Sequence, residues 1–265
     1  MKFWSKAFLV LALALLALPF AGLLLWSLAG EWPWPQLVPA TVSFRGWTAF
    51  AAMAEKFLEA IVTSGLLSSA VTLLCLLVSL PAARALAYYQ FAGKRLIEIF
   101  FISPLLAPVM SIAMGVHMQF IRLGLADTLP GVMLIHLFSC LPYGILILRD
   151  ALLAVGSQWE DQAKVLGASR WQAARYIVLP LLAPGLVAAS VMVFIVSFSE
   201  YILTFIIGGG KIVTFSLLIF PYLQGGDRNI SSVLSIIFLL VILLWILVLE
   251  LLARRYTGQG RFFHL

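Results

Sequence analysis

The sequence predicts an all-α integral membrane protein with six transmembrane helices, and three observations support this. Of its 265 residues, 63% are hydrophobic and only 11% are charged, whereas about a quarter of the residues in a typical soluble domain are charged. The mean hydropathy is +1.08. Several apolar runs also reach the roughly 20 residues that a helix needs to cross a ~30 Å hydrocarbon layer.

Six apolar runs, bounded by charges, glycines and prolines, are the expected spans. They lie at Ala7–Ala29, Ala60–Tyr88, Leu96–Met118, Leu129–Leu148, Leu181–Ile207 and Ile230–Ala253. The first run follows two lysines and has the small residues of a secretory signal at its end. Its apolar stretch exceeds the roughly 7–15 residues of a signal core, which favours a signal anchor that remains as the first span.

The segments that join these spans differ in character. Residues 30–59 form the longest outer loop, whose "EWPWPQLVP" start suits an aromatic interfacial belt and whose later part is expected to hold a short surface helix. A tight turn is predicted around Asp127. Residues 208–229 carry glycines at both ends of an apolar centre and form either a loop or a short re-entrant segment.

The basic residues indicate the orientation of the chain. With the N-terminus inside, 12 of the 17 lysines and arginines fall on the inner face and 5 on the outer face, the bias expected of cytoplasmic loops. Both termini are therefore predicted to be cytoplasmic. The net charge of +6 is then explained by the orientation of the chain in the membrane, so the expected surrounding is lipid and not nucleic acid.

The expected domains are residues 1–58 (first helix and outer loop), 59–253 (a core of five spans) and 254–265 (a cytoplasmic tail).

The sequence predicts neither nucleotide hydrolysis nor metal binding. A phosphate-binding loop needs Gly, four residues and Gly-Lys-Ser/Thr, but "FIIGGGKIV" has Phe205 at the first glycine and Ile212 at the hydroxyl position. Cys75 and Cys140 fall inside apolar runs, which indicates small buried side chains and not a disulfide or a metal pair. We therefore expect no catalytic residues, no metal and no cofactor bound directly by this chain.

The inner loop 149–180 is long for a plain connection. Gly167 is expected to end one helix and Ser169 to begin the next, with Pro180 either ending the second helix or marking entry to the following span. The segment is therefore predicted to form two short cytoplasmic helices at an angle.

The first of these helices is predicted to have an apolar and a polar side. The apolar side comprises Trp159, Ala163, Val165 and Leu166, and the polar side comprises Glu160, Asp161 and Lys164. Such a helix packs either on its own bundle or in a groove of another protein. An ordinary amphipathic linker has the same pattern, so the pattern alone leaves these alternatives open.

The spacing in this segment resembles the coupling motif of the permease subunits of ABC importers. That motif reads Glu-Ala-Ala, three residues, Gly, nine residues and Ile-x-Leu-Pro. Here Asp161-Gln162-Ala163 precedes the first spacer, and Gly167 is followed by nine residues and Ile177-Val178-Leu179-Pro180. Asp161 replaces the glutamate conservatively, whereas Gln162 departs from the alanine. Similarity extends to "LPAARALAYYQFAGKR" (80–95), "SPLLAPV" (103–109) and "HLFSCLPYG" (136–144).

The resemblance implies a type I ABC importer permease fold in the bacterial inner membrane. It also implies a second permease subunit, expected to be a different chain, two ATPase subunits that hold ATP and Mg, and a periplasmic solute-binding protein. The coupling residues carried over are Asp161, Gln162, Ala163, Gly167, Ala168, Ser169, Leu179 and Pro180. Among the branches of the family, the permeases for polyamines look most similar, with those for phosphonate, ferric iron and thiamine as alternatives.

Polar residues inside the predicted fifth span suggest a substrate pathway. Glu200 lies in "IVSFSEYILTF", where an ionised carboxylate is costly and usually faces a cavity or a partner. Pathway candidates are Glu200, Ser197, Ser199, Tyr201 and His136. The alternative for Glu200 is a carboxyl satisfied by neighbouring helices, and for His136 a hydrogen-bonding residue of the helix packing.

One departure from the polyamine branch bears on the substrate. Polyamine permeases tend to carry two acids where this chain has Ser199 beside Glu200. An ion-coupled secondary transporter or channel is the alternative from another class, but it is expected to have intramembrane charge pairs.

Overall fold

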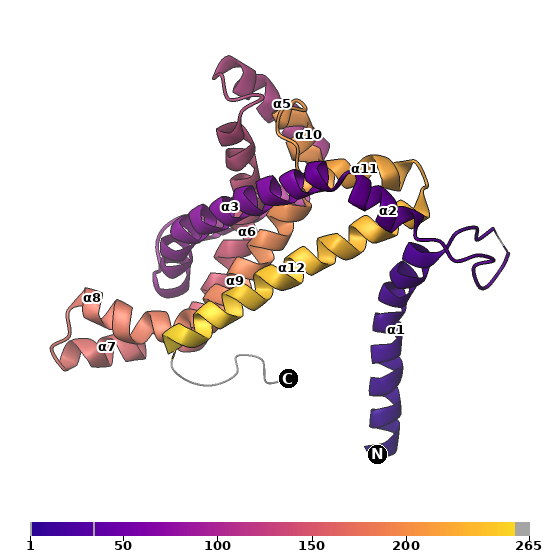
Figure 1. Cartoon of the computed structure of the whole chain (residues 1–265). Helices are drawn as coiled ribbons and strands as arrows, with labels where there is room; N and C mark the ends of the chain where they lie inside the picture. Colours follow the sequence, from indigo (N-terminus) through magenta and orange to yellow (C-terminus); the bar gives the residue numbers. More distant parts are fainter. Residues whose placement is uncertain (1, 34, 258–265) are drawn as a thin grey trace. The chain divides into compact units, whose positions relative to one another are not determined.

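The computed structural model describes residues 2–33 and 35–257, and the regular structure of this part is helical apart from an isolated bridge between Ala29 and Val42 (Figure 1). The chain divides into two compact units. One comprises Met1–Ile61 with Leu217–Val241, and the other comprises Val62–Ser216 with Ile242–Leu265. Each unit is described by itself.

The first unit contains the N-terminal helix and the outer loop. It holds α1 (Lys2–Leu28), α2 (Arg45–Ala52), the start of α3 (Ala54–Tyr88), most of α11 (Phe215–Gln224) and the first part of α12 (Arg228–Thr257). The Asn229 side-chain amide donates to the carbonyls of Trp26, Ser27 and Ala29 at 2.9–3.1 Å. Arg45 pairs with Asp227 at 2.7 Å. These contacts tie the start of α12 to the end of α1 and to α2, the short helix expected in the outer loop.

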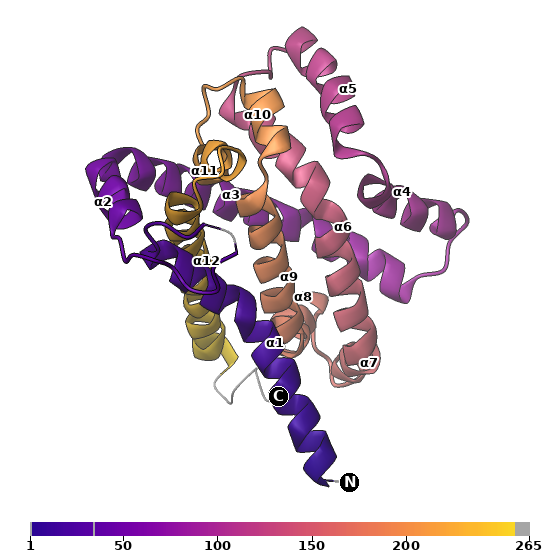
Figure 2. The same ribbon diagram turned by 90° about the vertical axis from the view of Figure 1, so that its right-hand side faces the viewer.

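The second unit is built around two helices that run alongside each other in both views, α6 (Leu129–Val155) and α9 (Leu179–Ser199) (Figures 1 and 2). Gly185 lies so close to the Ala151 side chain that a Cβ there would collide with it, as expected of small residues at helix contacts. The rest of this unit consists of α3 from Val62, α12 from Ile242, α4 (Lys94–Leu106), α5 (Val109–Arg122), α7 (Gln158–Val165), α8 (Arg170–Ala173), a π-helical turn (Ala174–Val178) and α10 (Ile202–Gly208).

Five helices of the described residues are long and apolar enough to cross a membrane, or six if the bent pair α4–α5 is one span. The five are Phe8–Leu28, Ala54–Tyr88, Leu129–Val155, Arg170–Ser199 and Arg228–Ala253. The predicted all-helical fold class is confirmed, and the number of spans agrees when the bent pair is counted once.

The third predicted span, Leu96–Met118, is wrong as a single helix. Helices α4 and α5 meet at an angle of 103° because Pro108 lacks the N–H that would continue the hydrogen-bond ladder. The residue before a proline is driven out of the helical region, and Ala107 accordingly has φ −85° and ψ 142°.

The fifth predicted span, Leu181–Ile207, is also wrong as a single helix. Helix α9 ends at Ser199, Glu200 is extended with φ −69° and ψ 117°, and α10 begins at Ile202. The two apolar runs read as one in the sequence because only Glu200 interrupts them.

The connecting segments also contain ordered elements. Residues 208–229, expected to be either a loop or a short re-entrant segment, contain the short apolar helix α11. The turn expected at Asp127 is confirmed by its φ of 59°. Helix α12 continues to Thr257, and the rest of the predicted tail, 258–265, lies outside the described residues.

Candidate functional site

Helices α7 and α8 form a hairpin at one end of α6 and α9 (Figure 1). Helix α7 ends in a Schellman motif: the Ala168 N–H donates to the Ala163 carbonyl and the Gly167 N–H to the Lys164 carbonyl, both at 3.0 Å. Gly167 has φ +87°, a left-handed conformation that other residues adopt at a cost. The turn therefore requires the glycine that the sequence motif has at position 167.

Helix α8 begins in a capping box. The Ser169 hydroxyl accepts the Gln172 N–H at 3.2 Å, and the Gln172 side chain accepts the Ser169 N–H at 2.8 Å. The predicted cap at Ser169 is confirmed. The second helix is not a separate short helix, however, because it passes through the π-helical turn Ala174–Val178 directly into α9. Pro180 lies in the first turn of α9 and so marks entry to the span.

An ion pair attaches the hairpin to α3. Arg84 Nη2 lies 2.8 Å from Glu160 Oε1 and 2.7 Å from Oε2, and Glu160 is only 7% exposed. Lys164 Nζ lies 3.4 Å from the same carboxylate. Glu160, predicted to lie on the polar side of the helix, is therefore turned inward by a partner 76 positions earlier in the chain.

The surroundings of Glu160 decide its charge state. Burial would raise the pKa of this carboxyl, but the hydrogen bonds and charge of Arg84, with the charge of Lys164, outweigh burial and hold the pKa below its ordinary value. The carboxylate is thus ionised at neutral pH. It forms a fixed link between the hairpin and α3.

The apolar residues of the hairpin divide between two directions. Ala163 and Ala173 are buried, at 4% and 0% exposure, whereas Val165 and Leu166 are each 87% exposed. The predicted single apolar side is wrong because Val165 lies two positions after Ala163 and so faces another way, and because Leu166 lies beyond the last residue of α7, at its C-cap. The two small alanines are buried where the hairpin packs, and its large aliphatic side chains project outward. Among the other predicted coupling residues, Ala168 is half-buried and the remainder are exposed.

Replacing Gly167 with alanine is expected to loosen this turn. No atom lies within 4 Å of a Cβ built at Gly167, so the cost comes from the left-handed backbone, about 1–2 kcal/mol. Hydrogen exchange at Gly167 and Ala168 should accelerate roughly 5- to 30-fold, and Gly167→Asn should show a smaller effect. Gly115→Ala is the control, since its Cβ is also unobstructed but its φ is ordinary. Equal exchange in all three variants would contradict the argument.

A second polar cluster lies where α9 gives way to α10. The Glu200 carboxylate accepts the Leu203 N–H at 3.2 Å and so caps α10. The Glu200 carbonyl accepts hydrogen bonds from the hydroxyls of Thr204 at 3.1 Å and Ser216 at 3.0 Å. The helix break and the acid are therefore coupled: the residue that interrupts α9 satisfies the first turn of α10.

His136 joins the same cluster from α6. Its Nδ1 lies 3.0 Å from the Ser197 hydroxyl and its Nε2 lies 2.8 Å from the Thr204 hydroxyl, and the residue is 1% exposed. Both ring nitrogens are occupied within the chain. This geometry favours the packing interpretation of His136 and Ser197, which stay predictions as pathway residues.

The other two candidate residues make local contacts. Ser199 is exposed and its hydroxyl donates to the Val196 carbonyl at 3.2 Å, and Tyr201 stacks on Phe205 with 5.9 Å between ring centroids. Thr204 and Ser216 were not among the predicted candidates. Thr204 could be predicted from the sequence, because it lies one helical turn after Glu200, whereas Ser216 is brought to Glu200 by the fold.

The described residues contain no group of three or more His, Cys, Asp or Glu side chains placed to hold a metal ion. Cys75 and Cys140 are buried free thiols.

Apolar spans, broken helices and a hairpin anchored to α3 define a polytopic membrane protein. Residues 75–258 match the family model of the binding-protein-dependent transport system inner membrane component. The chain belongs to this family.

Curated relatives agree with this membership. The chain is 29% identical over 173 residues to the diacetylchitobiose uptake system permease protein DasC of Streptomyces coelicolor, covering 65% of this chain and 62% of DasC. It is 26% identical over 175 residues to the spermidine/putrescine transport system permease protein PotC of Escherichia coli, covering 66% of each. The match spans about three fifths of DasC and two thirds of PotC. A longer match, 28% identity over 253 residues, covers 94% of this chain and 93% of PhnV of Salmonella paratyphi A, whose name assigns it to 2-aminoethylphosphonate transport.

A solved structure has the same fold. The chain matches a subunit of a bacterial alginate ABC transporter, in complex with an alginate pentasaccharide-bound periplasmic protein, with a TM-score of 0.66 and 16% identity. The match covers 98% of this chain and 97% of that one. At this identity the likeness establishes the fold alone.

Proposed function

We propose that this chain is the permease subunit of an ATP-driven importer of the bacterial inner membrane and forms half of an alternating-access pathway. The observation that carries the proposal is the hairpin: Val165 and Leu166 are 87% exposed although the turn that presents them is tightly bonded. Full burial of such a side chain stabilises an interface by roughly 1.5–3 kcal/mol. A partner protein that covers the hairpin would gain this free energy.

The partner proposed for the hairpin is an ATPase subunit. Two structural links can pass its movement to the spans: the Arg84–Glu160 ion pair to α3, and the uninterrupted helical path from α8 into α9. The remaining partners of the proposal are a second permease subunit of different sequence, a second ATPase and a periplasmic solute-binding protein. ATP and Mg belong to the ATPases, so this chain is proposed to be non-catalytic. Family membership argues against an ion-coupled secondary transporter.

Co-purification from membranes tests this proposal. An affinity-tagged full chain should retain an ATPase, and deletion of Asp161–Ala174 should remove the ATPase without removing the chain from the membrane. Deletion of Pro35–Ala40, in the outer loop, is the matched control and should leave the ATPase bound. If no ATPase accompanies the intact chain, or if the hairpin deletion retains it, the proposal is wrong.

The proposed substrate is a small charged solute, with a polyamine preferred and phosphonate, ferric iron or thiamine as alternatives. The names of the relatives cover a sugar, a phosphonate and polyamines, so they support transport more strongly than any one substrate. Support for a cation comes from Glu200, which is only partly buried and sits at a helix break. Broken helices that line a cavity are a common setting for substrate sites in membrane transporters.

A Glu200→Gln chain is expected to lose uptake of labelled putrescine or spermidine. A hydrogen bond to a charged group contributes about 1.5–3 kcal/mol, so the KM should rise roughly 10- to 100-fold. The amide can still cap α10, so insertion and ATPase binding should not change. Ser199→Ala is the control, because the Ser199 hydroxyl donates to the Val196 carbonyl of its own helix. Unchanged polyamine uptake by Glu200→Gln would assign the carboxylate to helix capping alone.

A further inference from the structure

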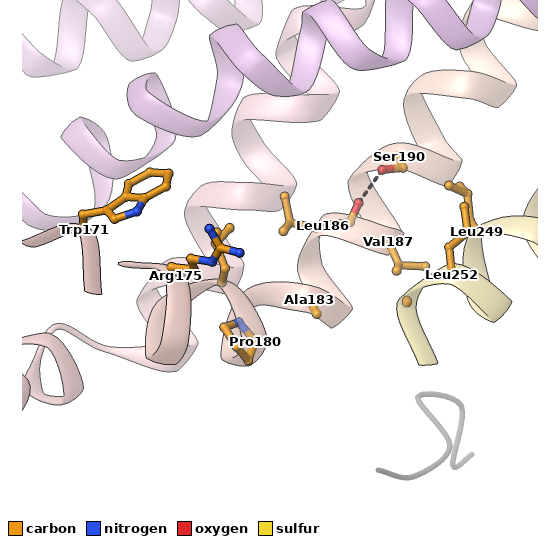
Figure 3. Close-up of a pocket in the computed structure, with 11 residues that line it drawn as sticks. Trp171, Arg175, Pro180, Ala183, Leu186, Val187, Ser190, Leu249 and Leu252 are labelled. Carbon is orange, nitrogen blue, oxygen red and sulfur yellow. Dashed lines mark hydrogen bonds between the residues drawn. The ribbon is translucent and has the colours of Figure 1, made fainter. Parts of the chain in front are cut away.

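An elongated groove lies within the second unit, between the start of α9 and the end of α12, with a volume of about 520 Å³ (Figure 3). Its walls are mainly aliphatic and include Leu186 and Val187 of α9 and Leu249 and Leu252 of α12. Ser190 also lines the groove, but its hydroxyl donates to the Leu186 carbonyl at 2.7 Å. The interior therefore suits a hydrocarbon chain better than water.

One end of the groove is cationic. Figure 3 places Trp171 and Arg175 together at this end, with Leu249 and Leu252 at the other. Among the described residues Arg175 pairs with no carboxylate, and its guanidinium lies 5.9 Å from the centre of the Tyr176 ring. Glu250 follows Leu249 on α12 but does not line the groove.

The backbone at this end is unusual. Arg175 lies in the π-helical turn Ala174–Val178 that joins α8 to α9, and such turns occur frequently at functional sites. Trp171 precedes it on α8, and Arg254 and Arg255 follow the groove-lining Ala253 in the sequence. Tryptophan and basic residues at the inner ends of spans are typical of the membrane interface.

We propose that this groove binds an anionic phospholipid of the inner leaflet. The phosphate contacts the Arg175 guanidinium, with the Trp171 indole N–H as a second donor, and one acyl chain lies between Leu186 and Leu249. A volume of 520 Å³ is within the roughly 300–1,000 Å³ of ligand sites, and anionic headgroups attract cations at this surface. The site does not depend on the transport assignment. Because Arg175 lies between the hairpin and α9, an occupied site would stiffen the path along which the proposed coupling runs.

Native mass spectrometry of the full chain, delipidated in detergent, tests the site. The chain is titrated with phosphatidylglycerol and with phosphatidylcholine of the same acyl chains. Phosphatidylglycerol should bind more tightly, and Arg175→Gln should weaken it roughly tenfold, toward the affinity for phosphatidylcholine. Arg170→Gln is the matched control, since Arg170 is an exposed cation of the same segment that does not line the groove. Circular dichroism checks that both variants fold.

Two further variants distinguish the occupant. Leu252→Trp, which fills the groove from the α12 side, should lower the affinity for both lipids. Leu252→Cys in native membranes should be protected from a maleimide by phosphatidylglycerol and should form no cross-link to another permease subunit. Equal phosphatidylglycerol affinity of Arg175→Gln and the unaltered chain would overturn the proposal, and so would a cross-link at Leu252→Cys that lipid does not prevent.

Discussion

A Leu166→Asp chain is expected to insert into the membrane and fold normally but to lose its ATPase. Leu166 is 87% exposed, so the substitution removes no contact from the chain's own core. In the proposed complex, the change removes roughly 1.5–3 kcal/mol of apolar burial and places a charge in an apolar interface. The affinity for the ATPase should fall at least 10- to 100-fold, which co-purification and ATP-driven uptake will measure.

Leu37→Asp is the matched control for this variant. Leu37 is also a highly exposed leucine, at 92%, but it belongs to the predicted outer loop. Its replacement should change neither membrane insertion nor ATPase recovery. An ATPase that remains bound to Leu166→Asp with unchanged affinity would show that the hairpin tip is not the docking surface.

Arg84→Gln and Glu160→Gln are expected to give a different defect, in which the ATPase stays bound but transport is lost. Each change leaves one member of a hydrogen-bonded ion pair without its partner. Because the Glu160 side chain is 9% exposed and that of Arg84 is 35% exposed, we expect a loss of about 1–3 kcal/mol, below the 3–5 kcal/mol of fully buried pairs. The hairpin should detach from α3, so ATP hydrolysis should no longer depend on substrate.

A double-mutant cycle measures the link directly. The Arg84→Gln/Glu160→Gln chain should be less destabilised than the sum of the single variants, because neither group is left alone. Lys211→Gln is the control, since Lys211 pairs with Asp127 through side chains that are 69% and 39% exposed, and exposed pairs contribute roughly 0–1 kcal/mol. Strict additivity of the two single changes would contradict the proposed link.

The pH dependence of the same pair has a definite sign. Because the pKa of Glu160 is lowered below its ordinary value of 4.5 in the folded chain, its contribution to stability is present above that value. It is lost as the pH falls through the folded-state pKa. The free energies of unfolding of the unaltered chain and Glu160→Gln should therefore differ by a constant amount between pH 6 and 8, and should converge below pH 4.5.

The sequence by itself determined the features that depend on neighbouring residues. Apolar runs of membrane length predicted where the helices lie, but not where two of the spans are broken. Gly167 and Ser169 marked the turn correctly because a left-handed residue and a helix cap are set within a few positions of chain. The family resemblance rests on the same spacing, and the match of residues 75–258 to the family model confirms it.

Only the tertiary structure decided which side chains face inward. The sequence placed Glu160 on a polar helix side, but only the fold supplies its partner Arg84. His136 likewise receives its partners from α9 and α10. The break at Glu200 was likewise not evident from the sequence, because the backbone there is satisfied by the Glu200 side chain and by the hydroxyls of Thr204 and Ser216. A helical pattern gives the spacing of residues around an axis, but the rotation of that axis is set by partners distant in the sequence, which is why Val165 and Leu166 project outward while Ala163 is buried.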